Sequence, residues 1–392
     1  MDTVRGFVRR LSEVVASGGR ALVARRARRI VLPAAARFGL EGTILRTTPF
    51  DPSVPVQRPG STTEIPQLLE WYDSLDGGDG MDLRENDLGV DLAAILGLAT
   101  GRKMTFANEV PLHVEQFGYT WFLETGPAMF DGDLYGPVEG DVRERVEQII
   151  SALVGLPERR ATHLGGAIRM RNAACCLVES DPSSAYGLLV VALETLSRGF
   201  GQPSESWRDW DQAESWDKFI AQLPLSQRDA DRLRERLLSN KQVRLKRTFV
   251  DYAANNLSES FWRQPKRKYD PGHEVTPAGV KRRGGSWGED APLSELVPTD
   301  PKILGKRLGR SYDARSRVFH DGARLDVISL IAVPGAPTTE PLPFGALRKI
   351  LDHLLWLEIE KAAANAPELP EFQVRAEASD PSEEDRSSEP GP

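Results

Sequence analysis

The chain has 392 residues, 40% of them hydrophobic, and a formal net charge of −7, values that suit a globular protein with a packed core. The acidic balance argues against a generally basic coat for nucleic acid, so any basic surface has to be local. No apolar run reaches membrane-spanning length and the N-terminus lacks the apolar core of a secretory signal, so a cytoplasmic protein without membrane contact is expected.

The cysteine content and the known motifs exclude several kinds of chemistry. Cys175 and Cys176 are the only cysteines, and adjacent cysteines on a helical pattern give neither a disulfide framework nor CxxC metal spacing. The chain also lacks an HExxH motif, a nucleophile elbow and a Walker loop. We therefore expect reduced thiols, no metal and no cofactor.

Residues 1–39 are rich in arginine. The first 30 residues hold eight arginines against Asp2 and Glu13, with apolar residues between the charges. This pattern predicts a basic amphipathic helical segment followed by a basic turn. Its charged face contacts RNA or another anionic surface, or its apolar side packs on the rest of the protein; the sequence leaves both open.

Residues 40–140 have a mixed pattern. Thr43–Thr48 and Met104–Val110 read as strands, whereas Asp91–Ala99 reads as a short buried helix. The glycine-rich Asp76–Gly80 lacks the Lys-Ser/Thr of a P-loop and the distal Glu of an EF-hand, so it predicts a turn. We predict a small α+β domain for residues 40–140.

The pattern is helical over residues 141–364. Asp141 precedes a helix that Pro157 closes, and a second helix is expected over residues 162–178. Asp181-Pro182 supplies an N-cap and an N1 proline for a third helix, which we expect Gly199 to end.

Glu194 lies beside the apolar stripe of this third helix rather than opposite it. A partly buried carboxylate at this position needs a cationic partner, for which Arg315 and Arg317 are candidates. The alternative is an exposed glutamate on the surface of the helix.

A basic loop insertion is predicted at residues 257–298. Arg267, Lys268, Arg282 and Arg283 alternate there with tryptophan and tyrosine, prolines and glycines. Such a loop can guide RNA, because phosphates meet the charges and bases meet the rings. A solvated surface insertion has the same composition, so both interpretations stay open.

The C-terminal part of the chain predicts two more helices and a tail. Thr299–Lys302 begins the first, Gly322 ends it, and Pro343–Ala364 forms the second. Residues 366–392 hold eight acidic and two basic residues among Pro and Ser, which predicts an acidic disordered tail over residues 365–392.

Ser311–Gly322 contains Arg315 and His320, five residues apart at the predicted end of a helix. In a straight helix this step turns the side chain by well over a quarter circle, so the two share one cleft only if the last turn is loosened. The Arg315-x-x-x-x-His320 spacing resembles the catalytic motif of the HEPN superfamily of helical ribonucleases, and Tyr312 to Gly322 is similar to its ApeA-like branch.

A second segment supports this resemblance. Ala192-Leu193-Glu194 is similar to the "Ala-Leu-Glu" helix that HEPN domains carry ahead of the Arg/His helix. The resemblance covers roughly residues 140 to 363 and implies a mainly α fold, with a C-terminal HEPN-like helical bundle preceded by the small mixed α+β region. One residue departs from the family pattern: Ser316 follows the arginine, where Asn, Asp or His is frequent.

The resemblance implies a metal-independent endoribonuclease of a defence or toxin type. A histidine can take a proton from a ribose 2′-hydroxyl and a guanidinium can hold the scissile phosphate, so His320 and Arg315 are the expected catalytic residues. Ser316, Glu194 and Tyr312 are expected to support them, and Arg317 to bind RNA. The family further implies a homodimer whose paired motifs line one cleft. The alternative is a non-catalytic helical module that binds RNA, a ligand or a partner protein.

Overall fold

The computed structural model is mainly α-helical, as the sequence predicts. Only the backbone is described for most of the strands. The structure describes residues 5, 23–33, 45–49, 64–74, 85–107, 130–135, 141–178, 180–202, 206–210, 213–239, 245–266, 269–270, 273–276, 279–282, 286–287, 291–295, 297–326, 330 and 340–366.

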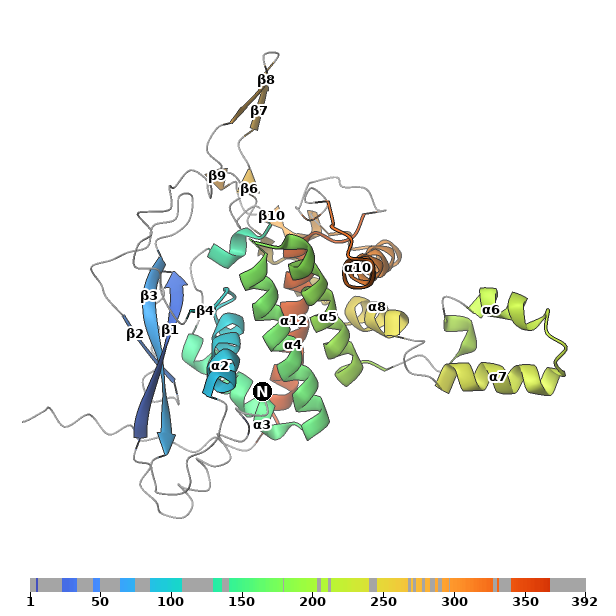
Figure 1. The fold of residues 1–392 in the computed structure, drawn as a ribbon, viewed down its shortest axis with the longest axis horizontal. Helices are drawn as coiled ribbons and strands as arrows, with labels where there is room; N and C mark the ends of the chain where they lie inside the picture. The colour runs from blue at the N-terminus through green and yellow to red at the C-terminus, as the bar shows by residue number, and fades with distance from the viewer. Residues whose placement is uncertain are drawn as a thin grey trace, which may run out of the picture.

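The helices follow the chain from residue 85 onward (Figure 1). The α-helices are α2 (Glu85–Ala99), α3 (Val142–Gly155), α4 (Glu158–Leu177), α5 (Pro182–Phe200), α6 (Ala213–Ile220), α7 (Gln227–Ser239), α8 (Leu245–Asn255), α9 (Glu259–Trp262), α10 (Pro301–Asp321) and α12 (Phe344–Ala363). Short 3-10 turns are η3 (Gly132–Tyr135), η4 (Trp207–Asp209) and η6 (Leu293–Glu295).

The strands pair antiparallel throughout. Four of them form one sheet in the order β2-β3-β1-β4, and the others pair two by two as β10-β5, β6-β9 and β7-β8. Their bounds are β1 (Val23–Pro33), β2 (Leu45–Pro49), β3 (Glu64–Ser74), β4 (Thr105–Ala107), β5 (Pro265–Lys266), β6 (Tyr269–Asp270), β7 (His273–Thr276), β8 (Gly279–Arg282), β9 (Ser286–Trp287) and β10 (Ala291–Pro292).

One hydrophobic core joins the helices. α4 and α5 pack along each other, α12 lies against α3, α4 and α5, and α10 packs on α5 and α8 (Figure 1). The core side chains are mainly leucine, isoleucine and alanine, and each buried leucine or isoleucine stabilises the fold by about 1.5–3 kcal/mol. This bundle is the framework that carries α10 and its motif.

α2 belongs to this same core. Leu92 and Ile95 of α2 are fully buried in one cluster with Ile149 and Leu153 of α3. α2 is therefore part of the helical body, rather than of a separate unit that ends at residue 140. The predicted α+β domain over residues 40–140 stays a prediction, because much of that range lies outside the described residues.

The N-terminal segment differs from its prediction. Residues 23–33 form the strand β1 instead of continuing a helical segment over residues 1–39, and β1 pairs with β3 from Val23↔Ser74 to Pro33↔Glu64. Val23, Ile30 and Val31 favour extended backbone, since β-branched side chains fit a pleated strand. Nearer the N-terminus, Arg5 Nη2 donates to the carbonyl oxygen of Leu156, just after α3, over 3.1 Å.

Three predicted helix starts agree with the structure, whereas α4 begins at Glu158 instead of residue 162 and α2 at Glu85 instead of Asp91. The side chains of Asp141, Asp181 and Asp300 each cap the first turn of α3, α5 and α10. The end of α5 is different: the helix continues past Gly199 to Phe200 and is capped by Gly201. A Cβ on Gly199 would lie 2.7 Å from the Cβ of His163, so this glycine lets α4 approach α5 instead of ending the helix.

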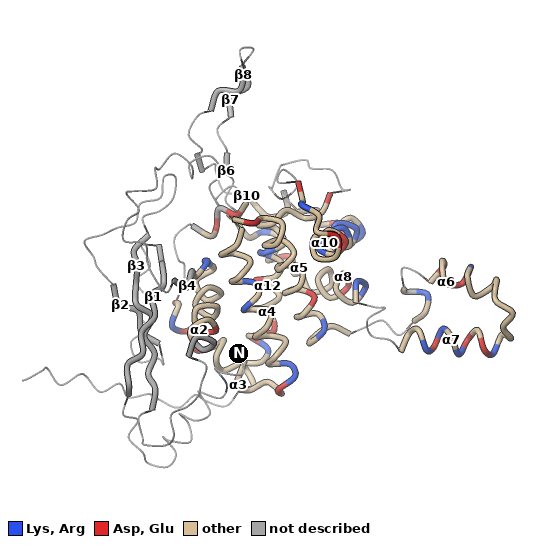
Figure 2. The backbone as a smooth tube through the Cα atoms, viewed as in Figure 1, with Lys and Arg blue, Asp and Glu red and all other residues tan. Residues whose placement is uncertain are grey.

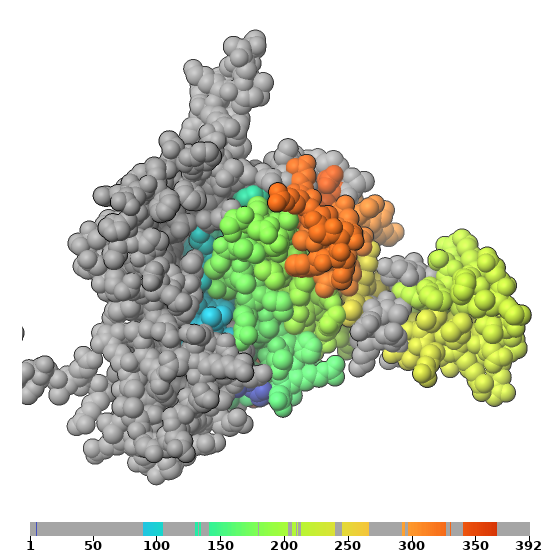
Figure 3. Space-filling view, viewed as in Figure 1, coloured from blue at the N-terminus to red at the C-terminus, as the bar shows by residue number. Residues whose placement is uncertain are grey.

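α6 and α7 form a hairpin that projects from the bundle (Figures 1 and 3). Three tryptophans pack together there: the rings of Trp207 and Trp210 lie 5.1 Å apart, and those of Trp210 and Trp216 lie 6.0 Å apart. α7 opens with a cap at Ser226, whose Oγ accepts from the Asp229 amide over 3.2 Å.

Candidate active site at the end of α10

α10 carries the Arg315/His320 motif in its last two turns. Asp300 Oδ1 accepts from the amides of Lys302 and Ile303 at the start of the helix, and Pro301 occupies the first turn. Gly322 ends the helix in the left-handed conformation, with φ 65°, as the sequence predicts. The motif therefore lies at a fixed helix end.

Arg315 pairs with the buried carboxylate of Glu194 on α5. Arg315 Nη2 lies 3.3 Å from Glu194 Oε2, and the Glu194 side chain is only 3% exposed. The other carboxylate oxygen of Glu194 accepts a hydrogen bond from Arg198 Nη2, one turn further along α5. Of the two cations that the sequence offers Glu194, the structure brings Arg315 to it.

Glu194, Arg198 and Arg315 together carry one negative and two positive charges. Two guanidinium groups share one carboxylate, which leaves a net positive charge beside α5. The side chains of Arg198 and Arg315 are 47% and 20% exposed, so part of each faces solvent. Within the cluster, Glu194 Oε2 and Arg315 Nε are buried without a hydrogen bond. The carboxylate oxygen lacks a donor and the Arg315 Nε–H lacks an acceptor.

Tyr312 lies between the motif and α8. Its ring centroid is 5.8 Å from the guanidinium carbon of Arg315 and 5.6 Å from the ring of Phe249. Burial, and next the negative charge of Glu194, raise the pKa of Tyr312. Tyr312 thus stays a neutral hydroxyl that restricts the position of Arg315.

His320 lies apart from this cluster. α10 remains helical through Asp321, so five residues rotate the side chain by about 140° from Arg315. His320 is exposed, and no hydrogen bond or ion pair joins it to any residue that the structure describes. The helix ends in a widened turn that contains His320, in which the amides of Gly322 and Ala323 both bond to the Arg317 carbonyl. Among the described residues, no hydrogen bond or ion pair joins Arg315 to His320 within one chain.

The other predicted site residues have less definite surroundings. Ser316 is half-buried and Arg317 is exposed, both on α10. In the basic loop, Arg267, Lys268 and Arg283 lie outside the described residues. For Arg282 only the backbone is described, which pairs with His273 between β7 and β8. The predicted tail over residues 365–392 also lies almost wholly outside the described range.

Sequence reasoning missed Arg198 and two contacts that fix α10. Arg198 follows Glu194 by four residues, a spacing that signals an ion pair on a helix. The Tyr186 hydroxyl is 2.8 Å from Ser311 Oγ and 2.9 Å from the Leu342 carbonyl oxygen. A Cβ on Gly187 would lie 2.6 Å from the ring of Phe319, so that glycine seats the last turn of α10.

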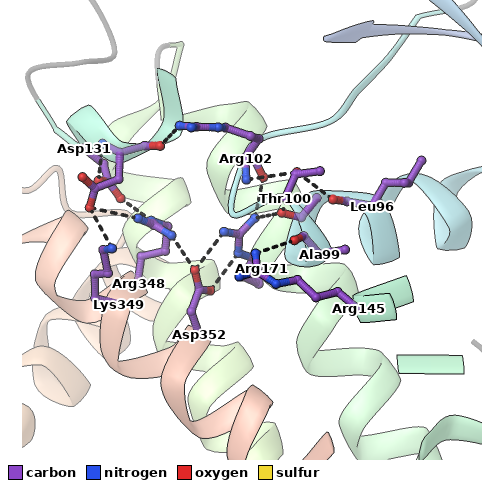
Figure 4. A network of polar contacts seen from close by, with 12 residues as sticks. Leu96, Ala99, Thr100, Arg102, Asp131, Arg145, Arg171, Arg348, Lys349 and Asp352 are labelled. Atoms are coloured by element: carbon purple, nitrogen blue, oxygen red, sulfur yellow. Dashed lines mark hydrogen bonds and ion pairs between the residues drawn. The ribbon is translucent and has the colours of Figure 1, made fainter. Parts of the chain in front are cut away.

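A buried ionic cluster joins α4, α12 and the segment around residues 97–104 (Figure 4). All three guanidinium nitrogens of Arg171 donate hydrogen bonds. Nε and Nη2 donate to the Asp352 carboxylate, each over 2.9 Å, and Nη1 donates to the carbonyl oxygens of Gly97 and Arg102 over 3.0 and 2.6 Å. Arg348 donates to both Asp131 and Asp352. This cluster fixes the segment after α2 to the bundle.

The two arginines of this cluster keep Asp352 ionised. Burial alone would raise the pKa of Asp352, but the charges of Arg171 and Arg348 outweigh it and lower that pKa. Next to it, burial raises the pKa of the Cys175 thiol to about 12. Cys176 is half-buried and donates to the Met104 carbonyl over 3.3 Å. Neither thiol has the surroundings of a reactive cysteine.

In the described part of the chain, no group of three or more His, Cys, Asp or Glu side chains could hold a metal ion. None of the described helices is long and apolar enough to cross a membrane. Comparisons with protein-family models, curated proteins and solved structures found no match to this chain.

Proposed function

We propose that the protein is a metal-independent endoribonuclease, in which Arg315 holds the scissile phosphate and His320 transfers protons. The observation that supports it most is the pair of guanidinium groups of Arg198 and Arg315 on the one buried carboxylate of Glu194. Glu194 orients both cations, and their surplus charge suits an incoming phosphate. The exposed His320 lies at the same helix end.

The proposed reaction needs only these groups and the ribose. His320 takes the proton of the 2′-hydroxyl, and the 2′-oxygen attacks phosphorus while the bond to the 5′-oxygen breaks. A proton returned by the histidine neutralises the leaving 5′-oxygen. The guanidinium groups stabilise the added negative charge on the phosphate. The products are a 2′,3′-cyclic phosphate and a free 5′-hydroxyl.

A homodimer is part of the proposal, because one chain separates its two motif residues. With about 140° of helix rotation between Arg315 and His320, we infer that Arg315 of one copy works with His320 of the other across a two-fold axis. We place this dimer in the cytoplasm, in a defence or toxin role. The separation also favours the second candidate function, a non-catalytic helical module that binds RNA, a ligand or a partner protein.

A mixing experiment tests the dimer and the catalytic roles together. His320→Ala and Arg315→Lys should each lower RNA cleavage by about 10²–10⁴-fold, since alanine cannot move a proton and ammonium lacks the two-point grip of a guanidinium. If the site is shared, mixing the two inactive variants should restore activity, because half of the sites in a mixed dimer combine an intact arginine with an intact histidine.

The control is His163→Ala, which removes a histidine on α4 whose ring bonds only its own helix, 2.6 Å from the Arg159 carbonyl. This variant should cleave RNA like the unaltered protein. Single variants that stay inactive after mixing would exclude the shared site. Full activity of both single variants would mean that another site cleaves RNA, and an unaltered protein that does not cleave RNA would leave the non-catalytic module as the function.

A further inference from the structure

The outer face of α10 carries a row of four basic side chains, Lys302, Lys306, Arg310 and Arg317, which we call the basic stripe. All four are exposed. At about 100° of rotation per residue, they fall within about 80° of one another, and His320 lies in the same arc. Blue positions lie at α10 in Figure 2, and atoms of this helix, in orange, lie at the surface in Figure 3. The stripe therefore leads along the helix to the proposed catalytic histidine.

The basic stripe lacks the acidic partners that several other exposed cations of the described chain have. Three such ion pairs, each four residues apart, are Arg143–Glu147, Arg247–Asp251 and Arg263–Glu259. No ion pair or hydrogen bond joins a side chain of the stripe to any described residue. The positive charge of the stripe is thus uncompensated within the described chain.

The acids nearest to the stripe do not neutralise it. Asp313 is the only acid within its arc, and both oxygens of Asp313 accept from Lys246 of α8 over 2.8 and 2.9 Å. Asp321, the other acid of α10, lies at the end of the helix. Lys302, Lys306 and Arg310 follow one another at four-residue steps, and such like-charge pairs destabilise a helix. A stripe that weakens its own helix indicates a use in binding.

We propose that the basic stripe binds the phosphate backbone of the RNA strand and leads it to His320. The stripe runs about 22 Å from Lys302 to Arg317, with about 6 Å for each four-residue step, so several successive phosphates can contact it. The choice of RNA as the polyanion rests on the proposed function. The stripe itself is a separate binding surface, distinct from the Glu194 cluster on the inner side of α10.

Binding can be tested without cleavage, on the full chain carrying His320→Ala. The anisotropy of a fluorescent single-stranded RNA is titrated in EDTA at several KCl concentrations. Replacing Lys302, Lys306, Arg310 and Arg317 together with glutamine should weaken binding and lower the slope of log K against log salt by about 3, at about 0.7 per lost phosphate contact. The melting temperature should stay the same or rise, since repulsion along the helix is removed.

The matched control removes four exposed cations that have acidic partners, Arg143, Lys218, Arg247 and Arg263, also to glutamine. It carries the same charge change, so its salt slope should hardly move. Equal losses in both variants, or no loss in the first, would overturn the proposal. So would stripe-dependent binding of polyglutamate but not of RNA, which would make the stripe a site for acidic protein segments.

This experiment separates the two proposals. Suppose that the salt slope of RNA binding depends on the stripe but the unaltered protein never cleaves RNA. This result would support the stripe as a binding surface and exclude the ribonuclease function. If the unaltered protein cleaves RNA and replacing the stripe leaves the salt slope of RNA binding unchanged, the ribonuclease function stands and the stripe is not the RNA-binding surface.

Discussion

Asp352 is the acid that holds two buried arginines of different helices. Its two oxygens accept from Arg171 on α4 and Arg348 on α12, and its side chain is 14% exposed. Removing one partner of such a group leaves the other charges buried and uncompensated, which costs about 3–5 kcal/mol. The lowered pKa of Asp352 makes this contribution depend on pH.

The pH dependence has a definite sign. Because the folded-state pKa of Asp352 is below the unfolded value of about 3.9, its contribution is complete above that value and is lost as pH falls through the folded pKa. Asp352→Asn should therefore lower the free energy of unfolding strongly near neutral pH and progressively less below about pH 4. Urea unfolding of both proteins over a pH series measures the difference.

Glu259→Gln is the matched control, since it removes an acid that is 80% exposed in its ion pair with Arg263. It should change stability little at any pH. A constant difference between Asp352→Asn and the unaltered protein from neutral to acidic pH would mean that Asp352 is not ionised in the cluster.

At the scale of elements, the last turn of α10 is seated on α5 through Gly187 and Phe319. An alanine at Gly187 gains about 1 kcal/mol of helix propensity but would lie 2.6 and 2.7 Å from two ring carbons of Phe319. Phe319 is 45% exposed, so its ring has to move, and the turn that carries His320 moves with it.

Gly187→Ala should thus stabilise the protein less in the presence of Phe319 than in a Phe319→Ala background, with a coupling of about 0.5–3 kcal/mol. Urea unfolding of the two single variants and the double variant gives this coupling. The same effect of Gly187→Ala in both backgrounds would show that α10 does not rest on this glycine.

Local signals account for the elements that the sequence predicted. Asp141, Asp181 and Asp300 begin helices in the structure because a short acceptor side chain satisfies the free amides of a first turn. Gly322 ends α10 because glycine adopts positive φ at little cost. The pairing of Glu194 with Arg315 also followed from a local feature, a carboxylate beside an apolar stripe that needs a cation.

Features that depend on distant segments were not predictable. Arg171 and Arg348 read as ordinary helix residues in the sequence, yet they are among the largest fully buried side chains. Arg348 and Asp352 are four residues apart, a spacing that also suits a surface ion pair, whereas the contacts Arg171–Asp352 and Arg348–Asp131, which make the cluster, join distant segments. Gly199 was misread for a similar reason: its role is set by the close approach of α4, not by its own helix.

At the scale of the whole molecule, the inner and outer sides of α10 differ in their chemistry. The inner side of α10 brings Arg315 to Glu194 and Arg198, and the outer side carries the basic stripe and His320. The cluster of Arg171, Arg348 and Asp352 lies elsewhere in the bundle and ties the segment after α2 to α12. A second copy of the chain is what the proposal requires to bring the two sides of α10 together.

The ends of the RNA products test the proposed chemistry most directly. We expect the unaltered protein to leave a 2′,3′-cyclic phosphate and a free 5′-hydroxyl in excess EDTA, because the ribose supplies the nucleophile and His320 moves the protons. A single 2′-deoxy sugar at the cut site should abolish the cut. Mass spectrometry of the products decides between the outcomes: a 5′-phosphate end, cleavage that EDTA stops, or cutting at the 2′-deoxy site would contradict the account.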